Sequence, residues 1–300
     1  MKHGLKIISF LMLLFLTSQI AGLYLLNLSI ESIHETSEGI DVIYSEPITG
    51  RPELEGQASF NYIIIMVFIG TALLLLLIRF RLFKIWKAWF FLAIWGALSI
   101  SFSVVMGDTA ASIIALLLAY LKTYRGNAII HNLTEIFIYP GIAIMISPIF
   151  NVYWAIMLLI AISIYDMIAV WKSKHMVKLA KAQSENKMFS GLMIPYVNKE
   201  KKQEVKLKMS KNITKGKTTS AILGGGDIAF PMIFAGSVMT SLIESGASKE
   251  IAFFKVLIIS LFSGIALFGL FLKSQKGKFY PAMPFITAGC FIGYAIILLL

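Results

Sequence analysis

The chain alternates long apolar runs with short charged stretches along its whole length. Each run has about 20 residues, which is the length that a helix needs to cross a hydrocarbon core roughly 30 Å thick. Hydrophobic residues make up 58% of the chain and charged residues 14%, whereas about a quarter of a soluble domain is charged. The pattern therefore predicts an all-α, polytopic membrane protein.

Nine apolar runs predict about nine transmembrane helices. They cover residues 5–28, 59–80, 88–107, 109–121, 128–149, 151–171, 218–243, 251–272 and 279–300. The fourth run is short for a full crossing, so it either borrows residues from the following turn or crosses a thinned region. The first run follows Lys2 and Lys6 as a secretory signal would, but it is longer than one, so we expect a retained helix.

These runs divide the chain into three parts. Residues 1–171 hold six helices, residues 172–217 form a basic loop, and residues 218–300 hold three helices. If the N-terminus is cytoplasmic, 24 of the 27 Lys and Arg residues fall on the inner side, as the positive-inside rule favours. The N-terminus and the 172–217 loop are then cytoplasmic, and the C-terminus lies outside.

Two polar segments interrupt the predicted bundle. The outer loop 29–58 is acidic, while the loop 172–217 carries thirteen Lys and three Glu. The basic loop has few large apolar residues, so we expect it to be mobile. A net charge of +11 that lies mostly in one loop beside a membrane indicates an attraction to anionic lipid at most, and no nucleic-acid partner.

Three carboxylates lie inside the predicted spans, namely Glu135, Asp166 and Asp227. An ionisable side chain in hydrocarbon costs several kcal/mol, so by default it marks a functional site. Asp166 precedes Lys172 by six residues, or about 9 Å of helix. Asp227 follows Lys217 by ten residues on the returning helix, so the two aspartates are expected at similar depths below the cytoplasmic surface.

Two carboxyl groups that lie close together in a low-dielectric site cannot both be ionised, so they share one proton. The ionised partner can then take a proton from water while the protonated partner polarises a carbonyl, which is the chemistry of aspartyl proteases. Asp166 and Asp227 are therefore the predicted catalytic pair. The sequence contains no cofactor motif, and we expect no bound metal.

The residues around Asp227 fit this role. The run Gly224-Gly225-Gly226 would cost roughly 1 kcal/mol per glycine inside a helix, but it would let an extended peptide approach the backbone. Pro231 removes the helical hydrogen bond to the carbonyl of Asp227. In the simpler interpretation, the glycines allow close helix packing and the proline only kinks the helix.

Three motifs resemble those of a known family. They are Tyr165-Asp166, Gly224-Gly225-Gly226-Asp227 and Pro281-Ala282-Met283, which resemble the YD, GxGD and PAL motifs of the presenilin and signal peptide peptidase family. Their order and the nine-span layout cover the whole chain. The resemblance implies an intramembrane aspartyl protease, closer to the microbial homologues than to the animal presenilins, in which residues 281–283 help to position a transmembrane-helix substrate. Met283 stands where the family usually has Leu.

Other intramembrane residues allow more than one interpretation. His131 and Glu135 are four residues apart, so they share a helix face and either form a structural pair or line a vestibule. Tyr165 either bonds near the aspartates or packs. Without the motif, the prolines at 281 and 284 would simply indicate a helix start.

Other functions are weaker predictions. None of the four histidines has the His-Glu-x-x-His spacing of a metalloprotease. An ion channel or proton-coupled transporter would also use buried carboxylates and broken helices. Transport sites tend toward the midplane, whereas both aspartates are predicted near one face. The sequence does not predict the oligomeric state.

Overall fold

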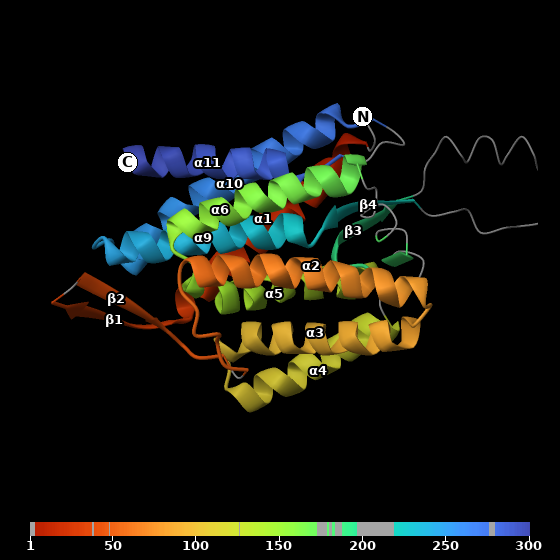
Figure 1. Cartoon of the computed structure of the whole chain (residues 1–300), viewed down its shortest axis with the longest axis horizontal. Helices are drawn as coiled ribbons and strands as arrows, with labels where there is room; N and C mark the ends of the chain where they lie inside the picture. The colour runs from red at the N-terminus through yellow and green to blue at the C-terminus, as the bar shows by residue number, and fades with distance from the viewer. Residues whose placement is uncertain are drawn as a thin grey trace, which may run out of the picture.

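A computed structural model describes residues 4–37, 39–47, 49–125, 127–172, 179, 182–183, 188–196, 219–275 and 280–300. Over these ranges the chain forms nine α-helices, as expected, together with four short strands (Figure 1). The helices are α1 (Leu5–Leu28), α2 (Gln57–Arg79), α3 (Phe83–Ser103), α4 (Asp108–Arg125), α5 (Ala128–Ile146), α6 (Val152–Met167), α9 (Gly226–Glu244), α10 (Lys249–Lys273) and α11 (Met283–Leu299).

Seven helical segments in the described part of the chain are long and apolar enough to cross a membrane. They comprise α1, α2, α3, α5 with the short 3₁₀ turn Ser147–Ile149, α6 with the π-helical turn Ile168–Lys172, α9 and α10. Helix α11 is apolar but has only 17 residues, and α4 is not among the seven. The short fourth span of the sequence prediction corresponds to α4, which extends to Arg125 and so includes residues of the following turn.

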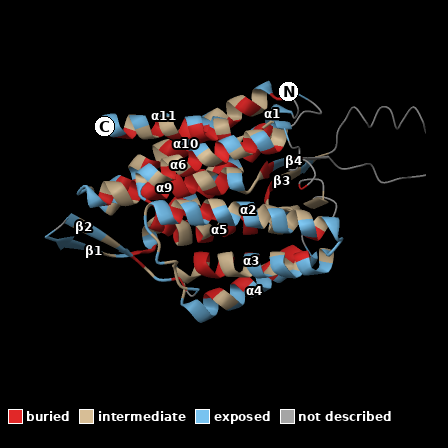
Figure 2. Cartoon of the chain, in the orientation of Figure 1, coloured by how far each residue is buried: buried red, intermediate tan, exposed pale blue. Residues whose placement is uncertain are grey.

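Helix α9 lies at the centre of the bundle and packs against α1, α5, α6, α10 and α11. It is the most deeply buried of the spans, with 67% of its most apolar window buried, whereas only 11% of the corresponding window of α2 is buried (Figure 2). Small residues allow this close packing. A Cβ atom at Gly236 would clash with Ser147 and Leu26. The helix that carries Asp227 is therefore held on most sides, while α2 lies at the edge, against α3 and α6.

The acidic outer segment forms a β-hairpin that the sequence analysis did not predict. Strand β1 (Ile30–Thr36) pairs antiparallel with β2 (Gly39–Tyr44). At its base, the Tyr44 hydroxyl lies 2.6 Å from the Thr240 hydroxyl of α9. Burial raises the pKa of Tyr44 to about 12, because removal from water disfavours the charged phenolate.

A second hairpin corrects the predicted start of the seventh helix. Residues 218–225 were expected to be helical, but β4 (Thr219–Gly224) pairs antiparallel with β3 (Gly191–Tyr196), and α9 begins only at Gly226. Strand β3 lies within the loop that was predicted to be mobile. The rest of that loop, apart from Lys172, Leu179, residues 182–183 and 188–190, lies outside the described residues, as do Lys2, Lys276, Lys278 and Phe279.

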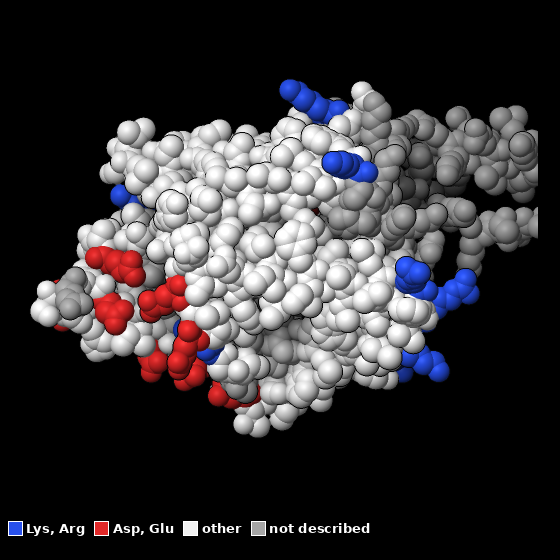
Figure 3. Space-filling model, viewed as in Figure 1, with Lys and Arg blue, Asp and Glu red and all other residues white. Residues whose placement is uncertain are grey.

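Charged side chains gather at the two ends of the bundle. In the view of Figure 3, acidic side chains cluster around the β1–β2 hairpin, and basic side chains lie mainly at the opposite end, near α2, α3 and the β3–β4 hairpin. The chain termini also lie toward opposite ends (Figure 1). The middle of this face shows almost no charged side chains, as a surface in contact with hydrocarbon requires.

Candidate active site

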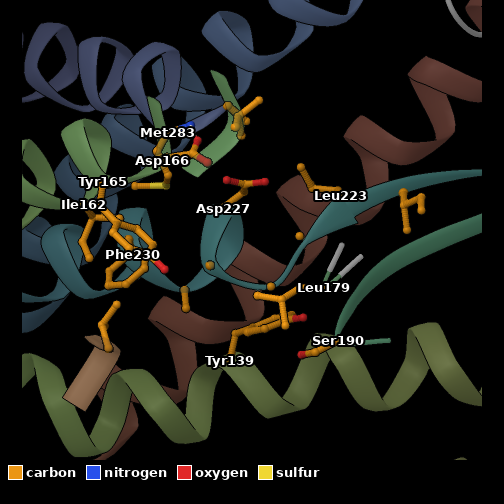
Figure 4. Close-up of a pocket in the computed structure, with 18 of the residues that line it drawn as sticks. Tyr139, Ile162, Tyr165, Asp166, Leu179, Ser190, Leu223, Asp227, Phe230 and Met283 are labelled. Carbon is orange, nitrogen blue, oxygen red and sulfur yellow. Dashed lines mark hydrogen bonds between the residues drawn. The ribbon is translucent and has the colours of Figure 1, made fainter. Parts of the chain in front are cut away.

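The structure brings Asp166 and Asp227 together. Asp166 lies near the end of α6 and Asp227 in the first turn of α9, and these two helices pack side by side. The two side chains point toward one another across a cavity (Figure 4). They lie close enough to interact electrostatically. This is the juxtaposition that the matched depths predicted.

Asp166 is buried, with 8% of its surface exposed, and accepts hydrogen bonds from the start of α11. The backbone N–H of Met283 donates to its Oδ2 across 3.1 Å, and the N–H of Ala282 contributes a further bond. The first N–H groups of a helix have no partner within the helix, and no side chain of Ala282 caps α11. Asp166 therefore serves as the cap of a neighbouring helix, which fixes its carboxylate.

This contact explains how Pro281-Ala282-Met283 reaches the site. The atoms that meet Asp166 belong to the main chain, so the contact does not depend on which side chain stands at position 283. Ala282 and Met283 line the cavity, and the buried Pro281 precedes them. The structure thus places the 281–283 segment directly beside Asp166.

Asp227 follows a turn that joins β4 to α9. Gly224 ends the strand, Gly225 is the N-cap and Gly226 is the first helical residue. The glycines are therefore outside the helix interior, and the helical cost predicted for them does not arise. The backbone of Gly224 hydrogen-bonds to the Asp227 carboxylate. Pro231 lies inside α9, four residues after Asp227, so the carbonyl of Asp227 receives no helical hydrogen bond there.

The cavity between the aspartates and α2 has a volume of about 910 Å³. Its walls are mostly apolar and come from α2, α5, α6, α9, β4, α10 and the start of α11. Asp227 is partly exposed because its side chain faces this space. A cavity of this size holds a short stretch of peptide, and its apolar walls suit side chains from a membrane segment.

Tyr165 lines the same cavity but its hydroxyl is turned toward α2. The hydroxyl lies 2.9 Å from that of Thr71, and its ring packs edge-on against Phe68, with the ring centroids 5.6 Å apart. Tyr165 therefore joins the helix bearing Asp166 to the helix at the edge of the bundle. Of the two roles left open by the sequence, this geometry shows packing, and the hydrogen bond to Thr71 belongs to that contact with α2.

Sequence reasoning missed two parts of the site. One is the β3–β4 hairpin, and the other is Tyr139 of α5, which lines the cavity next to Gly225. A signal for Tyr139 was present, since residues 131, 135 and 139 recur at intervals of four and share one helix face. In the part of the chain that the structure describes, no group of three or more His, Cys, Asp and Glu side chains comes together to hold a metal ion.

Comparisons with known proteins bear on the family and the fold of the chain. The family model described as signal-peptide peptidase, presenilin aspartyl protease matches residues 12–300. A search of curated proteins gives no match. Two solved structures of a presenilin family intramembrane aspartate protease are similar to this chain. The one in space group C222 has a TM-score of 0.59 and 17% identity, covering 95% of this chain and 94% of the other. The one in space group P2 has a TM-score of 0.60 and 18% identity, covering 96% of each. At this identity the structural likeness shows a shared fold.

Proposed function

Because the chain belongs to the family of signal peptide peptidase and presenilin aspartyl proteases, we propose that it hydrolyses peptide bonds in or beside transmembrane helices, with Asp166 and Asp227 as the catalytic pair. The observation that carries the proposal is the facing pair of carboxyl groups in a cavity within the bundle. Both acids come from helices that are long and apolar enough to span a membrane, so a substrate helix reaches them by moving within the bilayer.

The reaction uses one proton held between the two carboxyl groups. The ionised group takes a proton from water, the water oxygen bonds to the scissile carbonyl carbon, and the protonated group gives its proton to the carbonyl oxygen. In the second step, the carboxylate takes a proton from one hydroxyl of the tetrahedral diol as the C–N bond breaks. The other carboxyl group gives its proton to the leaving nitrogen, which restores the starting pair.

A peptide bond inside an intact helix is shielded by the helix's own hydrogen bonds, so the substrate has to unwind locally. Strand β4 lines the cavity through Ile222, Leu223 and Gly224, and a strand pairs with an extended peptide through main-chain hydrogen bonds. The absence of side chains at Gly224 and Gly226 leaves room for that backbone next to Asp227, whereas a side chain at Gly225 would point toward Tyr139. We therefore expect the cleaved segment to be extended.

The test is cleavage of a single-span substrate by the purified full-length protein in detergent. Asp166→Asn and Asp227→Asn should each abolish cleavage, because an amide neither accepts a proton from water nor supplies one. Asp108→Asn is the matched control, since Asp108 is exposed at the start of α4, and this variant should cleave at the wild-type rate. Far-UV circular dichroism should show the same helical content in all four proteins.

Cleavage by either site variant at the wild-type rate would exclude the pair. The alternative function, an ion channel or proton-coupled transporter, is tested with the same proteins in liposomes. It requires an ion or proton flux that depends on Asp166 and Asp227 without any cleavage. The family assignment favours the protease.

A further inference from the structure

A second set of buried polar side chains lies on α5 and at the end of α4, next to the turn that leads to Asp227. The proposed reaction does not use it. We refer to Lys122, His131, Glu135 and Tyr139 as the α5 cluster. Lys122 comes from the end of α4, and the other three share one face of α5. The cluster contacts β3 and the glycine turn, and Tyr139 also lines the cavity.

The cluster contains a buried ion pair. Lys122 Nζ lies 2.5 Å from Glu135 Oε1, and the two side chains are 2% and 0% exposed. Replacing such a pair with apolar side chains often costs no stability, because each charge loses its hydration on burial. The pair is therefore poorly explained by stability alone, and its contacts with other residues indicate what it does.

Tyr139 links the ion pair to the turn before Asp227. Its hydroxyl donates a hydrogen bond to the second carboxylate oxygen of Glu135 and also bonds to Ser190. The same hydroxyl lies against Gly225, where an added Cβ atom would be only 2.8 Å from it. Tyr139 also lies close enough to Asp227 to interact with it electrostatically. Glu135 thus sets the direction of a hydroxyl that supports the turn.

The strand beside the turn is held by two further side chains of α5. His131 Nε2 lies 2.7 Å from the carbonyl oxygen of Gly191, and because a carbonyl only accepts, Nε2 carries the proton. Asn132 pairs with both main-chain groups of Met193, donating to its oxygen at 2.8 Å and accepting from its nitrogen at 2.9 Å. Gly191 is the register partner of Gly224, so fixing β3 fixes the end of β4.

We propose that Tyr139, oriented by the Lys122–Glu135 ion pair, is a positioning residue that holds the Gly225 turn and thereby aims the Asp227 carboxylate at Asp166. This inference rests on the proposed function, because it assigns a role in the same reaction. It adds that the position of Asp227 depends on α5, a helix that carries neither Asp166 nor Asp227. A displacement of about 1 Å in a reacting group lowers a rate by up to about a hundredfold.

The experiment measures kcat and KM for cleavage of a single-span substrate by full-length variants. Tyr139→Phe removes only the hydroxyl and should lower kcat about tenfold to a hundredfold while KM changes less than about twofold. The control is Thr134→Val. Thr134 is fully buried on the same helix, but its hydroxyl donates only to carbonyls of α5, at 2.9 and 2.8 Å, so kcat should stay at the wild-type value.

A pair of double variants tests the role of Glu135 without leaving a single buried charge. Lys122→Met with Glu135→Leu removes the acceptor for Tyr139 and should lower kcat as Tyr139→Phe does. Lys122→Met with Glu135→Gln is equally uncharged but keeps an acceptor oxygen, so it should recover most of the lost kcat. A purely structural contribution of the ion pair would affect both double variants alike.

The second measurement is the affinity for a peptide whose scissile carbonyl is replaced by a hydroxymethylene group, which mimics the tetrahedral intermediate. Because a transition-state mimic depends on the geometry of the acids, its affinity should fall in Tyr139→Phe by the same factor as kcat. Unchanged kcat and mimic affinity in Tyr139→Phe, or a change in KM alone, would overturn the positioning role while leaving the proposed function in place. If Asp227→Asn also cleaved normally, the proposed function itself would fail.

Discussion

At the residue scale, the site depends on positions where no side chain fits. Gly225 faces the Tyr139 hydroxyl, and a Cβ atom there would also lie 3.1 Å from Ser190 Oγ. Gly191, opposite Gly224 in the ladder, has φ = 139°, a conformation that side chains disfavour. An added Cβ there would lie 2.8 Å from the ring of Phe189. The hairpin and the turn therefore contact side chains of α5 through their own main-chain atoms.

This close approach predicts the effect of Gly225→Ala. The methyl group has to displace either the Tyr139 hydroxyl or the turn, so activity should fall at least about tenfold, and the free energy of unfolding should fall by about 1–3 kcal/mol. The measurements are cleavage of the single-span substrate and thermal unfolding. Gly96→Ala is the control, since no described atom lies within 4 Å of an added Cβ there. Equal activity of the two variants would contradict the packing argument.

The residue types of the candidate site could be predicted from the sequence, but their partners could not. Asp166, Asp227 and the 281–283 segment stand out because polar or helix-breaking residues are costly in an apolar run. Lys122 is one of the basic residues expected on the inner side, yet it is buried against Glu135. Spacing along one helix relates His131, Glu135 and Tyr139, but nothing in the local sequence indicates which residue of another helix neutralises a buried acid.

At the scale of elements, α6 and α11 are joined by two contacts one turn apart. The Met283 N–H donates to Asp166, and one turn further along α11 the hydroxyl of Thr287 lies 2.8 Å from that of Ser163, in a buried position. Ser163 precedes Asp166 by three residues and Thr287 follows Met283 by four, so the hydroxyl pair fixes the same two helix segments. We expect it to set the register of α11 against Asp166.

A double-mutant cycle tests this register. Thr287→Val leaves the Ser163 hydroxyl without that partner and should cost about 1 kcal/mol of unfolding free energy, with a several-fold lower kcat. Ser163→Ala should do the same, and the double variant should cost little more than either single change, because the residues act as a pair. Thermal unfolding and cleavage assays on the four proteins give the coupling. Strictly additive losses would show that the two hydroxyl groups contribute independently.

The helices were predictable because apolar runs and their charged boundaries are local features, whereas the β3–β4 hairpin was not. Its strands are six residues each and pair across an intervening segment of the basic loop. The run 219–224 adjoins the apolar sequence of α9, so hydropathy alone extended the predicted helix back to residue 218. The correct end of that helix depends on the ladder with Gly191–Tyr196, a long-range contact that no window of sequence contains.

At the scale of the whole molecule, the separation of charge between the two ends predicts one orientation in the membrane. The acidic hairpin should face outward, and the basic end, with Lys84 at the start of α3, should face the cytoplasm. The depth of both aspartates below the cytoplasmic surface follows from the same orientation. The same orientation therefore predicts that the water for hydrolysis enters from the cytoplasmic side.

Thiol labelling of intact cells with a membrane-impermeant reagent tests the orientation. The native Cys290 is fully buried and should give little background. Glu35→Cys, on the exposed face of β1, should be labelled in intact cells, whereas Lys84→Cys should be labelled only after the membrane is permeabilised. The reverse pattern would invert the topology.

Pairing between β3 and β4 would hold the two halves of the site together even if the chain between the strands were cut. Asp166 precedes β3, Asp227 follows β4, and six residue pairs join the two strands. A single nick between Tyr196 and Thr219 would leave all six pairs on opposite fragments, each fragment bearing one acid. Neither fragment alone would contain both aspartates. Such a nicked protein would therefore work as a complex of two unequal subunits, in which assembly rather than covalent linkage completes the enzyme.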